Sequence, residues 1–496
     1  MKAGPARKST AYLLQAVSAA IVILALLPAS AGASPWAETG DPQLRSDIEI
    51  LANAGLLDNI TTHWPLPWRD IVARLHDSDS LSHQPAYVRE AARRVLGQAR
   101  NETQTGTLRL GASAGGTNLP SVVRGFDALG RGDFDGQLAA EYNWESTSIR
   151  LAAGAQVDHS TGKVHFLPDN SYIAQRVGNA VLYGGTLSHW WGPGWISALS
   201  LSNNARPFPQ VGIARLDTSP FETPWLSWLG PWQAEFFLGW LNDDRVIQDT
   251  LYDGLRFTFN PLPGLEIGLA RTQEVCGNRH RCNPVVDYFH FANDPGDVNN
   301  TNDEGVFDIR YTNVLGGVPF EVYTQLMNED SSPINHSGTS HLFGGSIWVP
   351  VGGNPVRLTF EYTDSVATAD IFSFGDYFHG FAYNNWDYVD GMRYRGQTIG
   401  FSLDSDSRLF SAQASWVDGG DRTYTLTFHH AQISTAQNLA GNVLTTTPVK
   451  INMGVARVTL PFRTLKLDLE GRLQSDQLRP NHGVAASVEA RVRVGL

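Results

Sequence analysis

Residues 356–362 have the sequence VRLTFEY, and this short stretch decides the fold class. Apolar residues stand at positions 356, 358, 360 and 362, with polar residues at the positions between them. In a β-strand, successive side chains point to opposite faces, so a sequence period of two puts all the apolar residues on one face. The polar positions include Arg357 and Glu361, so the polar face carries charges of both signs. The stretch therefore predicts a strand with one apolar face and one charged face.

The same period recurs from about residue 103 to the end of the chain. It is clear at 108–110, 138–144, 255–259, 465–470 and 488–496. A soluble β-sandwich also alternates in this way. Aromatic residues gather at strand ends, however, and the last residues form a strand that can close against the first. We therefore predict a mostly β fold, a closed antiparallel transmembrane β-barrel whose polar lumen is packed with ion pairs.

The length of this region bounds the number of strands. An outer-membrane strand has roughly ten residues plus its turn or loop, so about 22 residues per strand is a reasonable average. Residues 103–496 then give about 18 strands, with 16 as the alternative.

Composition excludes several other classes of protein. The chain has 37 basic and 49 acidic residues, for a formal net charge of −12, and a nucleic-acid partner needs a basic surface instead. After residue 33 there is no run of 18 apolar residues, which excludes a helical membrane protein. The aromatic content of 10% is too high for a disordered chain.

The N-terminal part has a different pattern. Residues 1–33 are typical of a secretory signal peptide, with a charged start, a short apolar core and a small-residue cleavage site. Residues 34–102 predict a three-helix module. One helix begins with Asp41 as N-cap and Pro42 after it, and two more begin near Pro67 and Pro85. We expect a bacterial outer-membrane protein with this module in the periplasm.

The two cysteines, Cys276 and Cys282, lie in the segment CGNRHRC. An even number of cysteines in an exported chain predicts one disulfide. A metal site with His280 is the alternative, but two Cys and one His at this spacing are a weak pattern. Because 276–304 is the longest polar stretch without alternation, we predict an extracellular loop there.

Two segments combine aromatic, amide and guanidinium groups that suit sugar rings and their hydroxyl groups. The first follows residue 187 and the second spans 377–395. A structural role as interfacial or loop residues is the alternative for both segments. The candidate polysaccharide-binding residues are Trp190, Trp191, Trp195, Asn203, Asn204, Arg206, Tyr383, Asn385, Trp386, Tyr388, Arg393 and Arg395.

Signals of catalysis are weak. The sequence has no G-x-S-x-G, H-E-x-x-H or Walker motif. The adjacent pairs Asp243-Asp244 and Asp303-Glu304 are expected to be loop charges, because neighbouring side chains of a strand point to opposite faces. We expect no cofactor, no metal and no enzymatic activity.

The blocks WWGPG (190–194), NNARPFP (203–209) and WLSWLGP (225–231) resemble the Wzi-type capsule-assembly proteins of the bacterial outer membrane. The resemblance spans essentially the whole chain after residue 33. It implies an 18-stranded barrel with a periplasmic helical bundle against its inner end. It also implies a lectin-like role, in which capsular or exopolysaccharide is held at the cell surface.

Two further functions remain open at this point, a diffusion porin and an outer-membrane enzyme. Besides the polysaccharide, the expected partners are outer-membrane lipids and the barrel assembly machinery. We expect a monomer.

Overall fold

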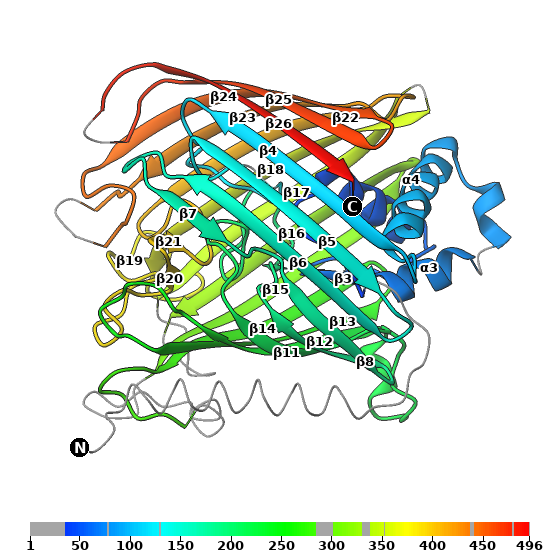
Figure 1. Ribbon diagram of the computed structural model, residues 1–496, viewed down its shortest axis with the longest axis horizontal. Coiled ribbons are helices and arrows are strands. Elements are labelled where there is room, and N and C mark those ends of the chain that lie inside the picture. The colour runs from blue at the N-terminus through cyan, green and yellow to red at the C-terminus, as the bar shows by residue number, and fades with distance from the viewer. Residues whose placement is uncertain are drawn as a thin grey trace.

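The fold is a closed antiparallel barrel, seen in the computed structural model in Figure 1. Residues 35–76, 79–127, 130–283, 301–329, 338–351, 353–436, 441–478 and 481–495 are described. The predicted signal peptide lies outside this set. The barrel strands are β4 (Leu108–Thr117), β5 (Phe134–Asn143), β6 (Thr147–Val157), β7 (Val164–Leu167), β8 (Tyr172–Val177), β9 (Ala180–Gly185), β11 (Gln210–Arg215), β12 (Trp232–Trp240), β13 (Thr250–Leu262), β14 (Leu265–Cys276), β15 (Asn302–Leu315), β16 (Val318–Glu329), β17 (Thr339–Val351), β18 (Asn354–Thr368), β19 (Tyr377–Phe378), β22 (Arg408–Val417), β23 (Thr423–Ile433), β24 (Val449–Phe462), β25 (Leu465–Gln474) and β26 (Ala485–Gly495).

The strand count confirms the predicted barrel size. β7 and β8 both pair with β6 and together make one interrupted strand, and β19 adds a short pairing on β18. Within the described residues the barrel therefore has 18 strands. The last strand closes on the first, with Gly495 opposite Gly111 and Glu489 opposite Thr117. Among the described barrel strands, closure leaves none at an open sheet edge, as a lipid environment requires.

The two faces of the barrel wall differ as the alternation predicts. On β18 the side chains of Arg357, Thr359 and Glu361 are buried, whereas Phe360 is exposed. Exposed leucine, phenylalanine and valine side chains recur on the outside of β4, β5, β6, β23 and β26. Polar groups inside and apolar groups outside are the arrangement of a barrel that lies in lipid.

The N-terminal residues form α2 (Pro42–Asn53), α3 (Trp68–His76), the 3-10 turn η1 (Asp79–His83) and α4 (Ala86–Glu102). The predicted N-cap of α2 is confirmed, since the Asp41 carboxylate accepts from the backbone N–H groups of Gln43 and Leu44 at 3.1 and 3.0 Å. Among the described helices, none is long and apolar enough to cross a membrane.

The helices lie at the end of the barrel where the connections are short. Two-residue turns join β13 to β14, β15 to β16 and β24 to β25 there, and we call this the short-turn end. Figure 1 shows α3 and α4 beside this end, close to the C-terminus. The opposite, long-loop end carries the connections 118–133, 186–209 and 369–407. One longer connection, 216–231, belongs to the short-turn end.

The lumen is filled by three parts of the chain, which we call the lumen plug: residues 35–68, 186–209 and 369–407. Short pairings link the first two parts, because β2 (His63–Trp64) pairs with β10 (Trp190–Trp191). β1 (Trp36–Ala37) pairs with β3 (Leu66–Pro67), and β20 (Arg393–Tyr394) with β21 (Gln397–Thr398). Helix α2 enters the barrel, where the indole N–H of Trp348 donates to the hydroxyl of Ser46 at 2.9 Å.

Two predictions about the 276–304 segment need correction. Cys276 is the last residue of β14, and 302–304 belong to β15, so the strands reach further than the polar sequence suggested. Asp303 and Glu304 are therefore strand residues and not loop charges. The Asp303 carboxylate accepts from Arg271 at 2.7 Å, while Glu304 accepts from the Thr272 hydroxyl at 3.2 Å. Residues 284–300 lie outside the described set.

Candidate functional site

The tryptophan segment lies inside the barrel. Trp190, Trp191 and Trp195 are buried in the lumen plug. The indole N–H of Trp195 donates to Glu321 at 3.0 Å, and its backbone N–H donates to Glu361 at 2.7 Å. The guanidinium groups of Arg357 and Arg45 lie 3.4 and 4.2 Å from the centre of the Trp195 ring. These contacts stabilise the plug and leave no ring face for a sugar in this conformation.

The polar candidates of the same segment also make contacts inside the protein, and one of them joins two parts of the plug. The Asn203 amide donates to the Phe126 carbonyl at 2.7 Å, and the Asn204 amide donates to the Thr398 carbonyl at 2.8 Å. Arg206 forms a salt bridge with Asp169. Their hydrogen-bonding groups are thus engaged within the protein.

The second candidate segment folds over the long-loop end, and its Tyr383, Tyr388 and Arg393 side chains are buried. The hydroxyl of Tyr383 donates to the Leu199 carbonyl at 2.7 Å, and that of Tyr388 donates to the Cys276 carbonyl at 2.9 Å. Arg393 makes a bidentate contact with Asp404, at 2.9 and 3.0 Å. These three residues hold the connection 369–407 in place.

Trp386 and Arg395 are the accessible members of the predicted set, and Asn385, which precedes Trp386 in the chain, is half-buried. The Trp386 side chain is 65% exposed, and Phe372 on the same connection is 84% exposed. The backbone N–H of Arg395 donates to Asp243 of the loop 241–249 at 2.7 Å, which fixes its backbone and leaves its side chain exposed. An exposed indole face and an exposed guanidinium group on the same connection suit a sugar ring that bears a carboxylate.

The structure joins Cys276 and Cys282 in a disulfide beside this surface. The ring of His280, inside the closed loop, lies 4.5 Å from the ring of Tyr388. The disulfide loop therefore supports the segment that carries Trp386. Within the described ranges, no three His, Cys, Asp or Glu side chains are grouped to hold a metal ion.

Sequence reasoning missed a carboxylate that joins the plug to the wall. Glu235 on β12 accepts from the Tyr183 hydroxyl at 2.7 Å, and its oxygens lie 3.0 Å from His189 and 3.3 Å from His63. Burial lowers the pKa of His63 to about 4, so its ring is neutral near pH 7. The repeated His-Trp pairs, at 63–64 and 189–190, are a sequence signal that points to this cluster.

A second missed group lies where α2 enters the barrel. Arg45 donates to Glu49 at 3.0 Å and to the carbonyls of Pro193 and Gly194 at 2.6 and 2.8 Å. Burial, with a further contribution from Glu321, raises the pKa of Glu49 to about 7. The sequence predicted ion pairs in the lumen but not that both partners of this one lie on a helix.

The fold and this interior define the class of protein: an outer-membrane β-barrel of 18 strands whose lumen is filled by its own chain. Residues 107–480 match the family described as capsule assembly protein Wzi. The chain belongs to this family.

Two relatives illustrate the likeness. A Klebsiella pneumoniae protein, described as an uncharacterized 55.8 kDa protein in the cps region, is 26% identical over 338 residues. The match spans 66% of this chain and 64% of that protein. A solved Escherichia coli structure has a TM-score of 0.78 at 20% identity and covers 92% of this chain and 99% of its own. That protein is described as Wzi, an outer-membrane protein involved in group 1 capsule assembly and a carbohydrate-binding β-barrel.

Proposed function

We propose that this protein binds capsular or exopolysaccharide at its long-loop end and helps to attach it to the cell surface without covalent chemistry. Membership of the capsule assembly family supports this function, and so does the carbohydrate binding described for the Escherichia coli structure. The observation that carries the proposal is the exposure of Trp386 and Arg395 on a stretch of chain that Tyr383, Tyr388 and Arg393 anchor. Because the backbone that carries these two side chains is held in place, less conformational entropy is lost when a sugar binds to them.

The orientation we propose places the long-loop end outside the cell and the helices α3 and α4 in the periplasm. Long loops of outer-membrane barrels face outward and short turns face the periplasm. The helical module lies at the short-turn end, where Arg93 of α4 forms a salt bridge with Asp421 of the β22–β23 turn at 2.6 Å. The proposal also includes a monomeric protein that contacts outer-membrane lipids and is inserted by the barrel assembly machinery.

The alternative function, a diffusion porin, requires an open lumen. Three chain segments occupy the lumen here, and each donates a hydrogen bond to a buried carboxylate of the barrel wall: Glu266, Glu361 or Glu329. The Glu266 carboxylate of β14, for example, accepts from the backbone N–H groups of Thr61 and Thr62 at 2.9 and 3.0 Å. These contacts support binding at the surface over diffusion through the lumen.

A weak site is sufficient for this function. A repeating polymer presents many copies of one epitope, and many barrels bind it at once, so the overall affinity far exceeds that of a single site. For the same reason, a small loss of affinity at each site adds up to a large loss of affinity for the whole polymer. A contact through Arg395 is also expected to weaken with salt if the polymer is anionic.

The test is the double variant Trp386→Ala with Arg395→Gln in the producing bacterium. We expect polymer to appear in the medium while barrel assembly and polymer synthesis remain normal. Trp228→Ala with Arg100→Gln is the matched control, because both residues are exposed at the short-turn end. A coat retained by the double variant would overturn the choice of residues. A coat retained after complete deletion would overturn the function itself.

A further inference from the structure

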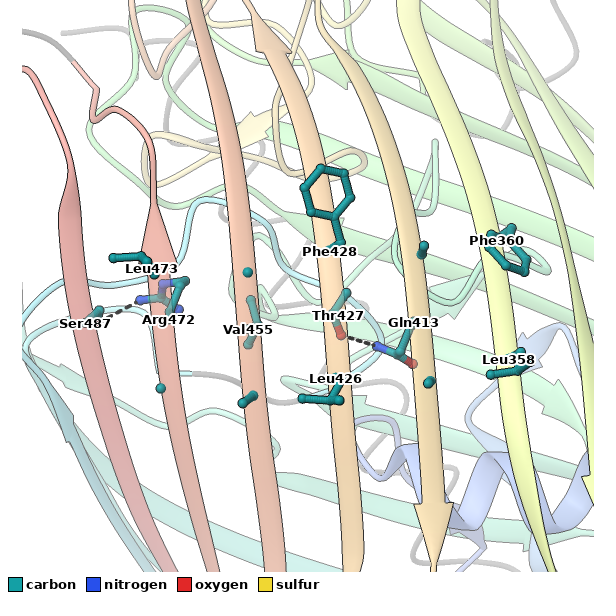
Figure 2. Close-up of a pocket in the computed structure, with 15 residues that line it drawn as sticks. Leu358, Phe360, Gln413, Leu426, Thr427, Phe428, Val455, Arg472, Leu473 and Ser487 are labelled. Carbon is teal, nitrogen blue, oxygen red and sulfur yellow. Dashed lines mark hydrogen bonds between the residues drawn. The ribbon is translucent and has the colours of Figure 1, made fainter. Parts of the chain in front are cut away.

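The outer wall of the barrel is hollowed across β18 and β22–β26. Figure 2 shows this groove, which has a volume of about 790 Å³. Small residues form its floor, and larger apolar residues such as Leu358, Phe360, Leu426, Phe428 and Leu473 border it. The small residues are Ala412, Ala414, Gly454, Ala456 and Gly471.

The groove belongs to the lipid-facing side of the wall. Gly454 and Gly471 are exposed, and a Cβ atom at either position would meet no other atom within 4 Å. The polar residues that line the region belong to the other face: Arg472 donates to Ser487, and Gln413 donates to Thr427, each at 3.1 Å. The hollow is therefore apolar and open toward the membrane.

A polar row lies on the same outward face, toward the long-loop end. Lys450 and Asn452 alternate with the buried Ile451 and Met453, so they share the face of Gly454. At about 3.4 Å per residue, Asn452 and Lys450 lie about 7 and 14 Å beyond Gly454 along β24. Apolar surface thus changes to polar surface within one or two outward positions.

This row offers free hydrogen-bond donors. With Nδ1 as its donor, His430 bonds to the Asn452 side-chain oxygen at 2.7 Å, which leaves the Asn452 NH₂ group pointing elsewhere. Lys450 is exposed and forms no salt bridge among the described residues. A cation and an amide donor above an apolar groove are complementary to a phosphate joined to an acyl chain.

We propose that this face binds an anionic lipid, with one acyl chain in the groove and its phosphate at Lys450 and Asn452. The order of groups along β24 matches the order of groups in such a lipid, from headgroup to chain. A smooth barrel wall would meet lipid chains without preference. A hollow with a charged donor above it selects both chain packing and headgroup charge.

Native mass spectrometry of the purified full-length protein tests this proposal, with phosphatidylglycerol and phosphatidylcholine of identical chains as probes. We expect one retained lipid, and phosphatidylglycerol to bind more tightly. Gly454→Leu with Ala456→Phe fills the groove and should reduce retention of both lipids at least about tenfold, a loss of about 1.4 kcal/mol. Lys450→Gln should remove the preference for phosphatidylglycerol while chain-dependent binding remains.

The matched control is Ala153→Phe, an exposed outward position on β6, which should bind lipid as the wild type does. Heat-modifiable migration in SDS gels verifies that each variant is a folded barrel. Equal retention in the groove-filling variant and the wild type would overturn the proposal. So would an unchanged headgroup preference in Lys450→Gln.

Discussion

At the scale of single residues, buried charges hold this molecule together. Arg256 makes a bidentate contact with Asp308 at 2.8 and 2.9 Å, and Arg310 donates to Glu321 at 2.6 Å. All four side chains are buried. Removing a charge from water is costly, and only well-placed partners offset that cost. Losing one partner is therefore expected to be far more damaging than losing a surface ion pair.

Arg45 is the sharpest test of this statement. Arg45→Met leaves Glu49 without its 3.0 Å partner and two carbonyls without a donor, and we expect a loss of about 3–5 kcal/mol. Protease resistance of the plug segments 35–68 and 186–209 would measure it. Arg93→Met is the control, because that exposed pair should contribute at most about 1 kcal/mol. Equal effects of the two variants would contradict the expectation.

The buried His63 predicts that the stability of the folded protein depends on pH. Burial holds its pKa at about 4, below the usual 6.5, so the folded state binds this proton less readily than the unfolded state. The free energy of unfolding therefore has its full value above pH 6.5. It falls by about 3 kcal/mol as the pH drops toward 4, because the unfolded state binds the proton first. Hydrogen exchange of residues 61–66 should accelerate over this range.

Replacement of the ring checks the assignment. His63→Gln should flatten the dependence on pH, whereas His83→Gln, at an exposed position, should leave it unchanged. A His63→Gln protein that still opens between pH 6.5 and 4 would show that another group is responsible.

At the scale of elements, the strands were predictable and the lumen plug was not. Alternation places Arg357, Thr359 and Glu361 on one face whatever the rest of the chain does. The destination of 186–209 depends instead on partners distant in sequence, such as Glu361 for Trp195 and Thr398 for Asn204. Local sequence shows that these residues are unusual without showing that they point inward. For this reason most of the predicted sugar-binding residues proved to be buried.

The disulfide is a local element, and we expect a local effect when it is removed. Closing seven residues restrains the unfolded chain by about 2 kcal/mol in the loop-entropy account. Cys276→Ser with Cys282→Ser should speed hydrogen exchange in 276–283 and in 383–396, because Tyr388 bonds to the Cys276 carbonyl. Peptide mapping without reductant should find the two cysteines joined in the wild type. Faster exchange throughout β14 would show that the bridge supports the wall as well.

At the scale of the whole molecule, the difference between the two ends predicts an orientation. Single cysteines at Ser82 and Asp244, in a background without Cys276 and Cys282, place an exposed thiol at each end. A membrane-impermeant reagent added to intact cells should label position 244 and not position 82. Labelling at position 82 would reverse the proposed orientation.

The filled lumen predicts poor transport. Liposomes that contain the wild-type protein should swell in small sugars no faster than empty liposomes, since three segments of the chain occupy the lumen. A general porin in parallel liposomes serves as the positive control. Rapid swelling would favour the porin function instead.

The pairing of β26 with β4 has a consequence for how the protein is made. The two strands are the first and the last of the barrel, yet they pair to complete the ring, and one part of the lumen plug, residues 35–68, precedes both. A ring that closed first would leave residues 35–68 no route to Glu235 and Glu266 except through its mouth. We therefore expect the biogenesis of this protein to follow the direction of synthesis. The strands would assemble around residues 35–68, and the pairing of β26 with β4 would form last.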